Sequence, residues 1–342
     1  MPVRVELFDD LDAVARDAGG ALDRRAQPSL FDRLDWFRLT LAHCPPPGRL
    51  LVARARSDGG SAAWLFLTVD RGRARMLASW YSLAPGIPCE RPDPALTPLC
   101  LAAIARRLAD HGAIHRIDLA PLVRGSREMA DALAGNGWIT RRDIATWNWS
   151  VAVEPGDWDA YWDARPATLR NILRRKARAA GLDIAVAEHF DPVAWDDYEA
   201  AYRASWKPAE GSPAFLRELA MMESAVGTLR LGIARREGQA VAAQFWLVED
   251  GIATIHKLAH VAAADRLSPG TILSAAMFRH VIKRDRVRRI DFGAGDDRYK
   301  ADWMDERRPL HALTAWNRRT ARGLVGVAAA RTAMLVRRRA SG

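Results

Sequence analysis

The segment from residue 288 to 303, RRIDFGAGDDRYKADW, gathers the side-chain types that acid–base chemistry needs. Its first residues predict a short buried strand, and Gly293 and Gly295 predict a turn where little side-chain bulk separates a ligand from the backbone. Such a polar set at a strand end is typical of ligand sites in α/β sheets, although an ordinary surface loop has the same composition. The candidates are Asp291, Asp296, Asp297, Tyr299, Lys300 and Trp303.

A second candidate site is the start of a predicted helix over residues 268–282, which opens with Ser-Pro-Gly-Thr. Serine is a common N-cap, proline is favoured at the first helical position, and glycine lets a ligand approach the free N–H groups. A helix start of this kind binds phosphate well, and a plain serine-capped helix is the alternative. The residues predicted to hold a phosphate are Ser268, Gly270, Thr271 and Ile272, with charge from Arg266 or Arg279.

Two histidines, His256 and His260, lie four residues apart in a predicted strand over residues 252–260. At the rise of a strand they are about 13 Å apart, too far to share an ion, so we predict no metal site. His256 suits a general base by its ordinary pKa, and a structural histidine is the alternative. Because side chains alternate along a strand, we expect His256 and Lys257 to point to opposite faces.

A predicted helix over residues 166–181 carries a basic stripe. Arg170, Arg174 and Arg178 follow one another at intervals of four, so they lie on one side of the helix. The stripe either grips an acidic or nucleotide-linked acceptor or is a solvated face.

The first segment resembles the D-F-G-x-G-x-x-x-Y-K-x-x-W signature of the CelD-like and FemAB-like acyltransferases, a branch of the GNAT superfamily. Residues 256–277 and the basic helix, residues 169–181, resemble further pieces, so the resemblance covers about residues 158–316. It implies acetyl-CoA, or another acyl-CoA, as co-substrate, with its pyrophosphate at the turn before the 268–282 helix. Pro269 stands where the superfamily has glycine. The acceptor implied is a small molecule or saccharide, such as a polysaccharide or cell-envelope precursor.

In this class of reaction an amine or hydroxyl attacks a thioester, so the site needs a base, oxyanion donors and an acid for the thiolate. Asp296 or His256 would be the base. The resemblance implies that Tyr299 is the acid and that Lys300 holds the oxyanion or a phosphate. It also places Trp206 and Lys207 near the acceptor, although a core tryptophan at a helix end is the alternative. The full set of expected acceptor contacts is Arg170, Arg174, Trp206, Lys207, Asp291 and Trp303.

The elements that must position these residues occur twice along the chain. LLVARARSDGG from Leu50 can be laid over LRLGIARREGQ from Leu229, which indicates an internal duplication, with chance similarity as the alternative. We predict an α+β (layered) fold of tandem GNAT-like domains, each a mixed, mostly antiparallel sheet flanked by helices. Residues 1–153 would form a degenerate first domain, and residues 154–342 a second domain that carries the active site.

The net charge of +10 suggests an anionic partner. A phosphorylated cofactor, a nucleotide-linked substrate, RNA or an acidic membrane face would all fit. An aminoacyl-tRNA-dependent FemAB-type transferase is therefore one alternative. A non-catalytic nucleic-acid-binding protein is another, but the basic stripes lack the interleaved aromatics of a single-strand binder.

Location is predicted from the cysteines and from apolar runs. Three cysteines without C-x-x-C spacing argue against a disulfide framework and fit a reducing compartment. The N-terminus does not follow the signal-peptide pattern, so we expect a cytoplasmic protein. The basic helix predicted over residues 318–339 either caps the second domain or makes a peripheral membrane contact.

Overall fold

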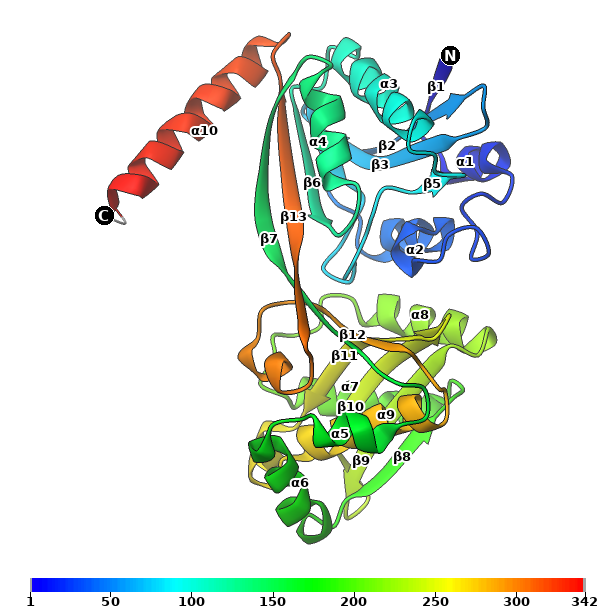
Figure 1. Cartoon of the computed structure of the whole chain (residues 1–342), viewed down its shortest axis with the longest axis vertical. Helices are drawn as coiled ribbons and strands as arrows, with labels where there is room; N and C mark the ends of the chain where they lie inside the picture. The colour runs from blue at the N-terminus through cyan, green and yellow to red at the C-terminus, as the bar shows by residue number, and fades with distance from the viewer. Residues whose placement is uncertain (1, 341–342) are drawn as a thin grey trace. The chain divides into compact units, whose positions relative to one another are not determined.

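The structure is a computed structural model that describes residues 2–340, and the side chains of residues 2–332 (Figure 1). The chain forms two compact units: Met1–Thr146 with Pro309–Gly342 is unit 1, and Trp147–Arg308 is unit 2. The predicted boundary after residue 153 is therefore corrected, since the last segment of the chain returns to unit 1. The reason is a strand pairing between residues 311–316 and 116–122 that local sequence does not reveal.

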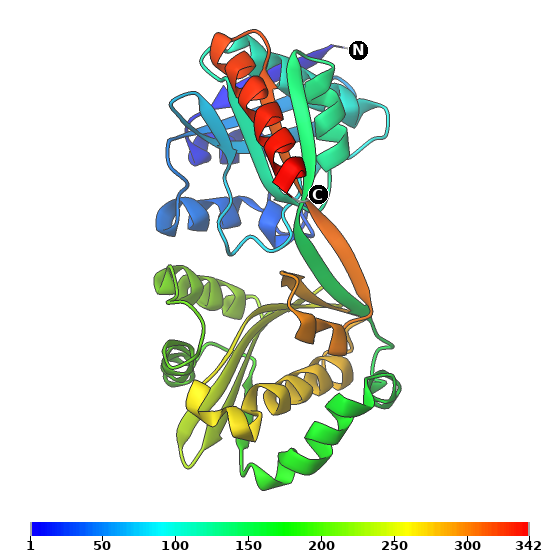
Figure 2. The same ribbon diagram turned by 90° about the vertical axis from the view of Figure 1, so that its left-hand side faces the viewer.

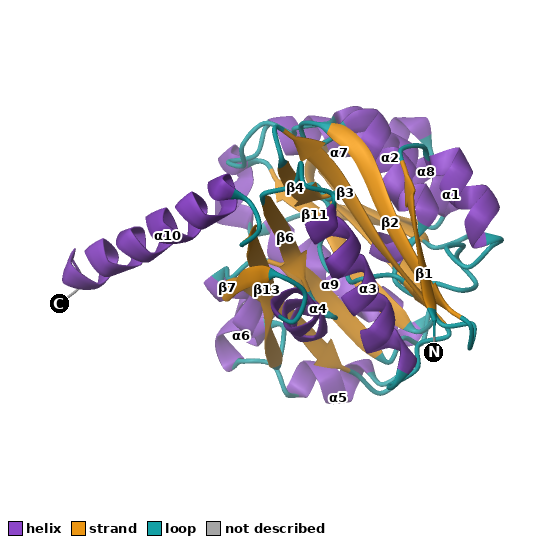
Figure 3. Ribbon diagram, turned by 90° about the horizontal axis from the view of Figure 1, so that it is seen from above, coloured by secondary structure: helices purple, strands orange, loops and turns teal. Residues whose placement is uncertain are grey.

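Unit 1 is a mixed sheet with the strand order β1-β2-β3-β4-β6-β13, and β5 pairs with β3. Only β4 and β6 run parallel. Its core forms where the apolar side of α3 packs on β2 and β3. Figure 3 shows α3 next to these two strands. The elements are β1 (Val3–Phe8), α1 (Leu11–Ala18), η1 (Leu30–Asp32), α2 (Leu34–His43), β2 (Arg49–Ser57), β3 (Ala62–Asp70), β4 (Arg73–Met76), β5 (Cys89–Glu90), α3 (Leu96–Asp110), β6 (Arg116–Leu122), α4 (Ser126–Ala134), β13 (Glu306–Asn317) and α10 (Ala321–Ala340).

Unit 2 has the strand order β7-β12-β11-β10-β9-β8, in which only β11 and β12 run parallel. Helices α7 and α8 cover one face of this sheet, and α5, α6 and α9 lie on the other (Figure 2). The elements are the end of β7 (Trp138–Ala152, of which residues 147–152 belong to this unit), α5 (Trp158–Asp163), α6 (Ala167–Ala179), β8 (Asp183–Ala187), α7 (Pro192–Arg203), α8 (Pro213–Ala225), β9 (Leu229–Arg236), β10 (Gln239–Glu249), β11 (Ile252–His260), η2 (Ala262–Leu267), α9 (Pro269–Lys283), β12 (Arg289–Ala294) and η3 (Arg298–Asp302).

Both faces of the unit 2 sheet are buried by aromatic side chains. Trp246 and Trp303 both pack on Phe278 of α9, with ring centroids 5.2 and 4.8 Å apart. On the other face Trp195 of α7 meets Phe245 at 5.6 Å. Consecutive residues of β10 thus serve opposite cores, as the period of a strand requires.

The helices α7 and α8 begin where the sequence signals a start. Asp191 accepts from two backbone N–H groups of α7, and Ser212 accepts from the N–H of Phe215 in α8. In both helices proline occupies the first turn, where its missing N–H costs nothing.

Two segments differ from the predicted pattern. The sequence predicts a strand over residues 74–81, but β4 ends at Met76, because Ser79 and Ser82 bond to each other and turn the chain. The strand β8 was not predicted. It is an edge strand that pairs only with β9, and five residues give a weak alternation. Within the described residues no helix is both long and apolar enough to cross a membrane.

Candidate functional site

The parallel strands β11 and β12 part within the sheet of unit 2. Their pairing runs from Ile252 with Arg289 to Thr254 with Asp291 and then stops. β11 nevertheless continues to His260. A strand that loses its neighbour in mid-sheet leaves backbone groups for another extended chain to pair with.

A β-bulge lies just beyond the point of parting. In the register, Phe245 faces Lys257 while Trp246 faces Ile255, so His256 is the extra residue. The His256 ring packs against Phe245 at 5.3 Å, and Lys257 lies over the Tyr202 ring of α7 at 5.7 Å. Both side chains therefore lie on the α7 side. The prediction of opposite faces is wrong, because the bulge breaks the alternation; bulges are common next to active sites.

The bulge also affects whether His256 can act as a general base. The side chain is buried, and burial, followed by the charge of Lys257, lowers the pKa of His256 to about 3. The imidazole is neutral near pH 7, but so low a pKa makes it a weak proton acceptor. The structure favours the structural alternative for this residue.

The start of α9 lies beside His260, the last residue of β11. A methyl group added at Gly270 would come within 3.0 Å of the His260 ring, so glycine is needed for this close approach. Ile272 donates its N–H to the carbonyl of Ser268, and no acceptor within the described part of the chain takes the N–H groups of Gly270 and Thr271. These two groups can bind an anion.

Ser268 does not cap the helix with its hydroxyl, which corrects the prediction. Its backbone is left-handed (φ 54°), and its hydroxyl instead accepts from Lys176 of α6 at 2.9 Å. The same ammonium donates to the carbonyl of Arg266, also at 2.9 Å, while the Arg266 side chain is exposed. Lys176 thus ties α6 to the loop that precedes α9.

On the β12 side, Lys300 closes the turn that follows the strand. Its ammonium is buried and donates to the carbonyls of Phe292, Ala294 and Gly295, at 2.9 Å for Ala294. Burial lowers the pKa of Lys300. These contacts give Lys300 a positioning role, and its protons are already used by the backbone.

Asp291 is held inside the same strand. Its Oδ1 accepts from the Asn148 amide and from the N–H of Gly293, both at 2.7 Å. Burial raises the pKa of Asp291 despite these bonds. The side chain therefore fixes the glycine turn relative to β7.

The remaining residues of the first candidate segment divide between surface and core. Asp296 forms a two-bond ion pair with Arg307, which lowers the pKa of its carboxyl and makes it a weaker base. Tyr299 packs its ring edge on Phe292 and is 40% exposed, yet desolvation of its hydroxyl, with the charge of Asp297, raises its pKa. Trp303 is buried on Phe278, so its role is in the core.

Lys207 and Lys257 approach the β12 turn from the loop between α7 and α8 and from β11. Burial lowers the pKa of Lys207 to about 8, and the charges of Lys257, Asp297, Lys300 and Glu210 also act on it. These charges belong to three segments: the loop between α7 and α8, β11 and the β12 turn. Trp206 is 62% exposed beside Lys207, so the alternative of a core tryptophan is wrong.

Glu210 holds Lys257 in this cluster, at 3.2 Å between Nζ and the carboxylate. Burial, followed by the charge of Glu210, raises the pKa of Tyr202 to about 12. Sequence reasoning missed Glu210 and Tyr202, because neither lies in a motif and both act only through the fold.

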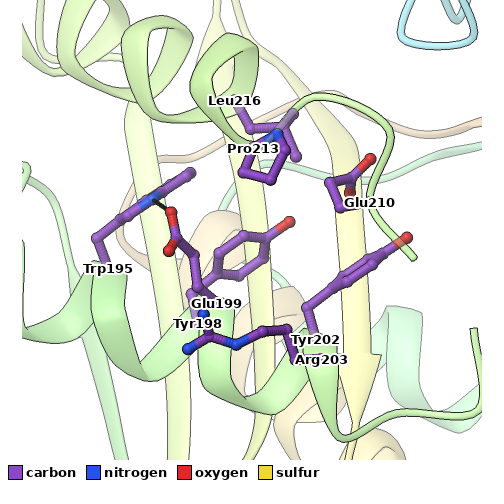
Figure 4. A pocket seen from close by; sticks show the side chains of 8 residues that line it. All are labelled: Trp195, Tyr198, Glu199, Tyr202, Arg203, Glu210, Pro213 and Leu216. Atoms are coloured by element: carbon purple, nitrogen blue, oxygen red, sulfur yellow. Dashed lines mark hydrogen bonds between the residues drawn. The ribbon is translucent and has the colours of Figure 1, made fainter.

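Glu210 and Tyr202 also border a cavity of about 50 Å³ between α7 and α8 (Figure 4). Its charged groups are largely engaged: Glu199 accepts from the Trp195 indole at 2.8 Å, and Glu210 pairs with Lys257. The walls are therefore mainly apolar and aromatic. The lining residues are Trp195, Tyr198, Glu199, Tyr202, Arg203, Glu210, Pro213 and Leu216.

Arg170 and Arg174 lie elsewhere, on the α6 side of the sheet. They line a groove of about 550 Å³ with residues of α5. The groove is on the α9 side of the sheet, because α5 and α6 contact α9 (Figure 2). Glu210 instead lines the cavity between α7 and α8 and pairs with Lys257, and both of their charges act on Lys207. The structure thus separates the expected acceptor contacts into two groups. Within the described residues no group of three or more His, Cys, Asp or Glu side chains could hold a metal ion.

An acetyltransferase (GNAT) domain model matches residues 164–301. This segment contains the parted strands, the bulge and the start of α9. A search of curated proteins found no match.

Solved structures share the fold over most of the chain. The C-terminal domain of a putative lysylphosphatidylglycerol synthetase from Agrobacterium fabrum has a TM-score of 0.58 at 15% identity, covering 93% of this chain and 96% of that one. FemX has a TM-score of 0.54 at 9% identity, covering 82% of this chain and 94% of FemX. A tandem GNAT protein from the clavulanic acid biosynthesis pathway has a TM-score of 0.52 at 14% identity, covering 91% of this chain and 98% of that one. At these identities the likeness shows the fold alone, and the predicted layered, tandem fold is confirmed.

Proposed function

From a chain whose residues 164–301 form a domain of the GNAT acyltransferase superfamily, we propose that the protein moves an acyl group from an acyl-CoA, with acetyl-CoA the simplest donor. The acceptor is an amino or hydroxyl group of a saccharide, polysaccharide or cell-envelope precursor. The observation that carries this proposal is the parting of β11 and β12 beside an uncapped helix start, with the bulge at His256 between them.

The donor fits this arrangement in two places. The N–H groups of Gly270 and Thr271 suit a pyrophosphate, because they lie at the positive end of α9. The edge of β11 from Leu258 to His260, which β12 does not pair, suits the amide-bearing arm of coenzyme A. When bound, the donor supplies an activated acyl thioester; the protein supplies orientation and proton transfer.

Lys207 is the proton acceptor in this proposal. Of the bases expected from the sequence, His256 is buried with a pKa of about 3, and Asp296 is paired with Arg307. Lys207 has a pKa of about 8, so a useful fraction of its amine is neutral just above neutral pH. Lys207 lies on the side of the sheet that α7 and α8 cover, and the N–H groups of Gly270 and Thr271 lie on the α9 side. The acceptor would therefore reach the acyl group of the donor from the opposite face of the sheet.

The test is ligand-dependent stability followed by turnover. Coenzyme A should raise the Tm of the full-length protein in a saturable way, by mass action on the folded state. Amine and saccharide acceptors are then screened with acetyl-CoA by release of free thiol. A flat Tm up to millimolar coenzyme A would reject an acyl-CoA donor.

A second candidate is transfer of an aminoacyl group from tRNA. It is supported by the net charge of +10 and by the fold shared with FemX and with the lysylphosphatidylglycerol synthetase domain. Aminoacyl-tRNA in place of acetyl-CoA should then support transfer, with no Tm response to coenzyme A.

A further inference from the structure

The groove between α5 and α6 has the size and lining of a ligand site. Its volume is about 550 Å³, within the range of pockets that hold small molecules. One wall is basic and another is aromatic or apolar. The lining residues are Trp162, Asp163, Ala167, Arg170, Asn171, Leu173 and Arg174.

The basic wall can take an anion. Arg170 and Arg174 are one helical turn apart, so both guanidinium groups reach the same side of α6. The partner of Arg170 is the exposed Asp163 at 3.5 Å, a surface pair of small worth. Arg174 has no ion-pair partner among the side chains that the structure describes. Guanidinium forks match the oxygens of a phosphate group.

The aromatic wall is fixed in place. Trp162 stacks on Trp158, with ring centroids 5.1 Å apart and planes 15° apart, and it lies 6.3 Å from Trp303 of the core. A held indole offers a flat surface on which a nucleotide base can stack. Phosphate and base together point to a nucleotide.

The groove lies beside the proposed donor site. Lys176 of α6 bonds the loop before α9, and Leu173, which lines the groove, lies three residues before Lys176 and so on the same side of the helix. A phosphorylated molecule held by the N–H groups of Gly270 and Thr271 can therefore continue along α6. The acceptor groups around Lys207 lie on the other face of the sheet.

We propose that this groove holds the 3′-phosphorylated adenosine end of the acyl-CoA donor, with Arg170 and Arg174 on the 3′-phosphate and Trp162 against the base. This inference rests on the proposed function and assigns the two arginines to the donor rather than to the acceptor.

The test compares coenzyme A with 3′-dephospho-coenzyme A by calorimetric titration of the full-length protein. The wild type should bind coenzyme A about tenfold more tightly, because only coenzyme A presents the phosphate. The R170Q/R174Q variant should bind both compounds equally, at the affinity that the wild type has for the dephospho compound. The matched control is Arg178→Gln, one turn further along α6 and outside the groove, which should keep the tenfold preference.

A preference that survives in R170Q/R174Q, or is missing from the wild type, overturns this inference but leaves the donor assignment intact. Failure of the wild type to bind either compound overturns both. A separate arm titrates uridine diphosphate, which lacks a 3′-phosphate. If that nucleotide binds and its affinity alone falls in R170Q/R174Q, the groove serves a nucleotide-linked acceptor and the inference is wrong.

Discussion

The two units repeat one plan but differ where ligands would bind. Both place a helical segment between the first and second strands, follow with a meander and a helix, and form one parallel strand pair. The strand after that helix begins Arg116-Ile117-Asp118 in unit 1 and Arg289-Ile290-Asp291 in unit 2. The end of β7, residues 148–152, pairs with β12 in unit 2, and residues 311–316 of β13 pair with β6 in unit 1. The difference between the units is therefore local.

The starts of the corresponding helices, α3 and α9, show the difference most clearly. In unit 1, Asp93 accepts the N–H groups of Ala95 and Leu96 with its side chain and that of Thr97 with its carbonyl. A carboxylate thus already occupies the place of an anion. In unit 2 the hydroxyl of Ser268 turns to Lys176, and the first N–H groups remain available.

The strand pairs differ as well. In unit 1, β4 ends at Met76, close to the last residue paired with β6, whereas β11 runs well past its last pair. Asp118 is held by ion pairs with Arg73 and Arg116, while Asp291 holds the glycine turn of β12. In unit 1, charged side chains fill the helix start and hold the strand, whereas the corresponding N–H groups and strand edge of unit 2 stay open.

The largest effect should come from Lys207→Met. We expect turnover to fall by about 10²- to 10³-fold, since a general base is lost. The Tm at pH 7 should rise. The pKa of Lys207 is lowered to about 8 in the folded protein, so its buried charge costs stability at lower pH, and stability returns as pH rises through 8.

The pH profile and a matched site sharpen this prediction. Wild-type turnover should rise with pH through about 8, and Lys207→Arg should abolish that rise, because arginine stays charged. Arg25→Met, an exposed residue in the corresponding loop of unit 1, should change neither turnover nor Tm. A Lys207→Met variant with unchanged turnover would remove this residue from the mechanism.

Placing a carboxylate at the start of α9 should make unit 2 resemble unit 1. We expect Ser268→Asp to weaken coenzyme A binding by about 100-fold, because like charges would meet there. Ser268→Asn is the control, since asparagine has the same shape and also tolerates the left-handed backbone. Titration calorimetry of both variants decides the matter: equal affinities would show that the helix start binds no anion.

Lys300→Met should destabilise the β12 turn. The carbonyls of Phe292, Ala294 and Gly295 would lose their donor, at a cost of about 2 kcal/mol in the free energy of unfolding. Turnover should also fall, because the turn positions Tyr299 and Asp297. Urea unfolding measures the first effect. Full stability with lost turnover would return Lys300 to a direct chemical role.

The smallest effect should come from Asp93→Ala in unit 1. Loss of the side-chain bonds to the start of α3 should cost about 1 kcal/mol, with coenzyme A binding at the unit 2 site unchanged. Thermal melts and titration stoichiometry test this. Binding of a second coenzyme A to the Asp93→Ala variant would show that Asp93 by itself prevents binding at the start of α3.

Local sequence was enough for most elements of both units. The caps at Asp191 and Ser212 and the prolines after them are short-range signals. They predict helices over residues 191–206 and 212–225, close to α7 and α8. Alternating residues likewise predict strands over 228–235, 241–248 and 252–260, close to β9, β10 and β11. The family resemblance of the second half carried the fold class. The edge strand β8 and the early end of β4 were missed, because their limits depend on neighbours and side-chain turns.

By itself the sequence determined which residues could do chemistry and roughly where their elements begin. Only the tertiary structure decided their roles: it buried Lys300 against backbone carbonyls, paired Asp296 with Arg307, and set His256 in a bulge. The physical reason is that pKa, burial and pairing are set by residues distant in the chain. Lys207 and its partner charges come from three separate segments, and no spacing within any one of them reveals the cluster.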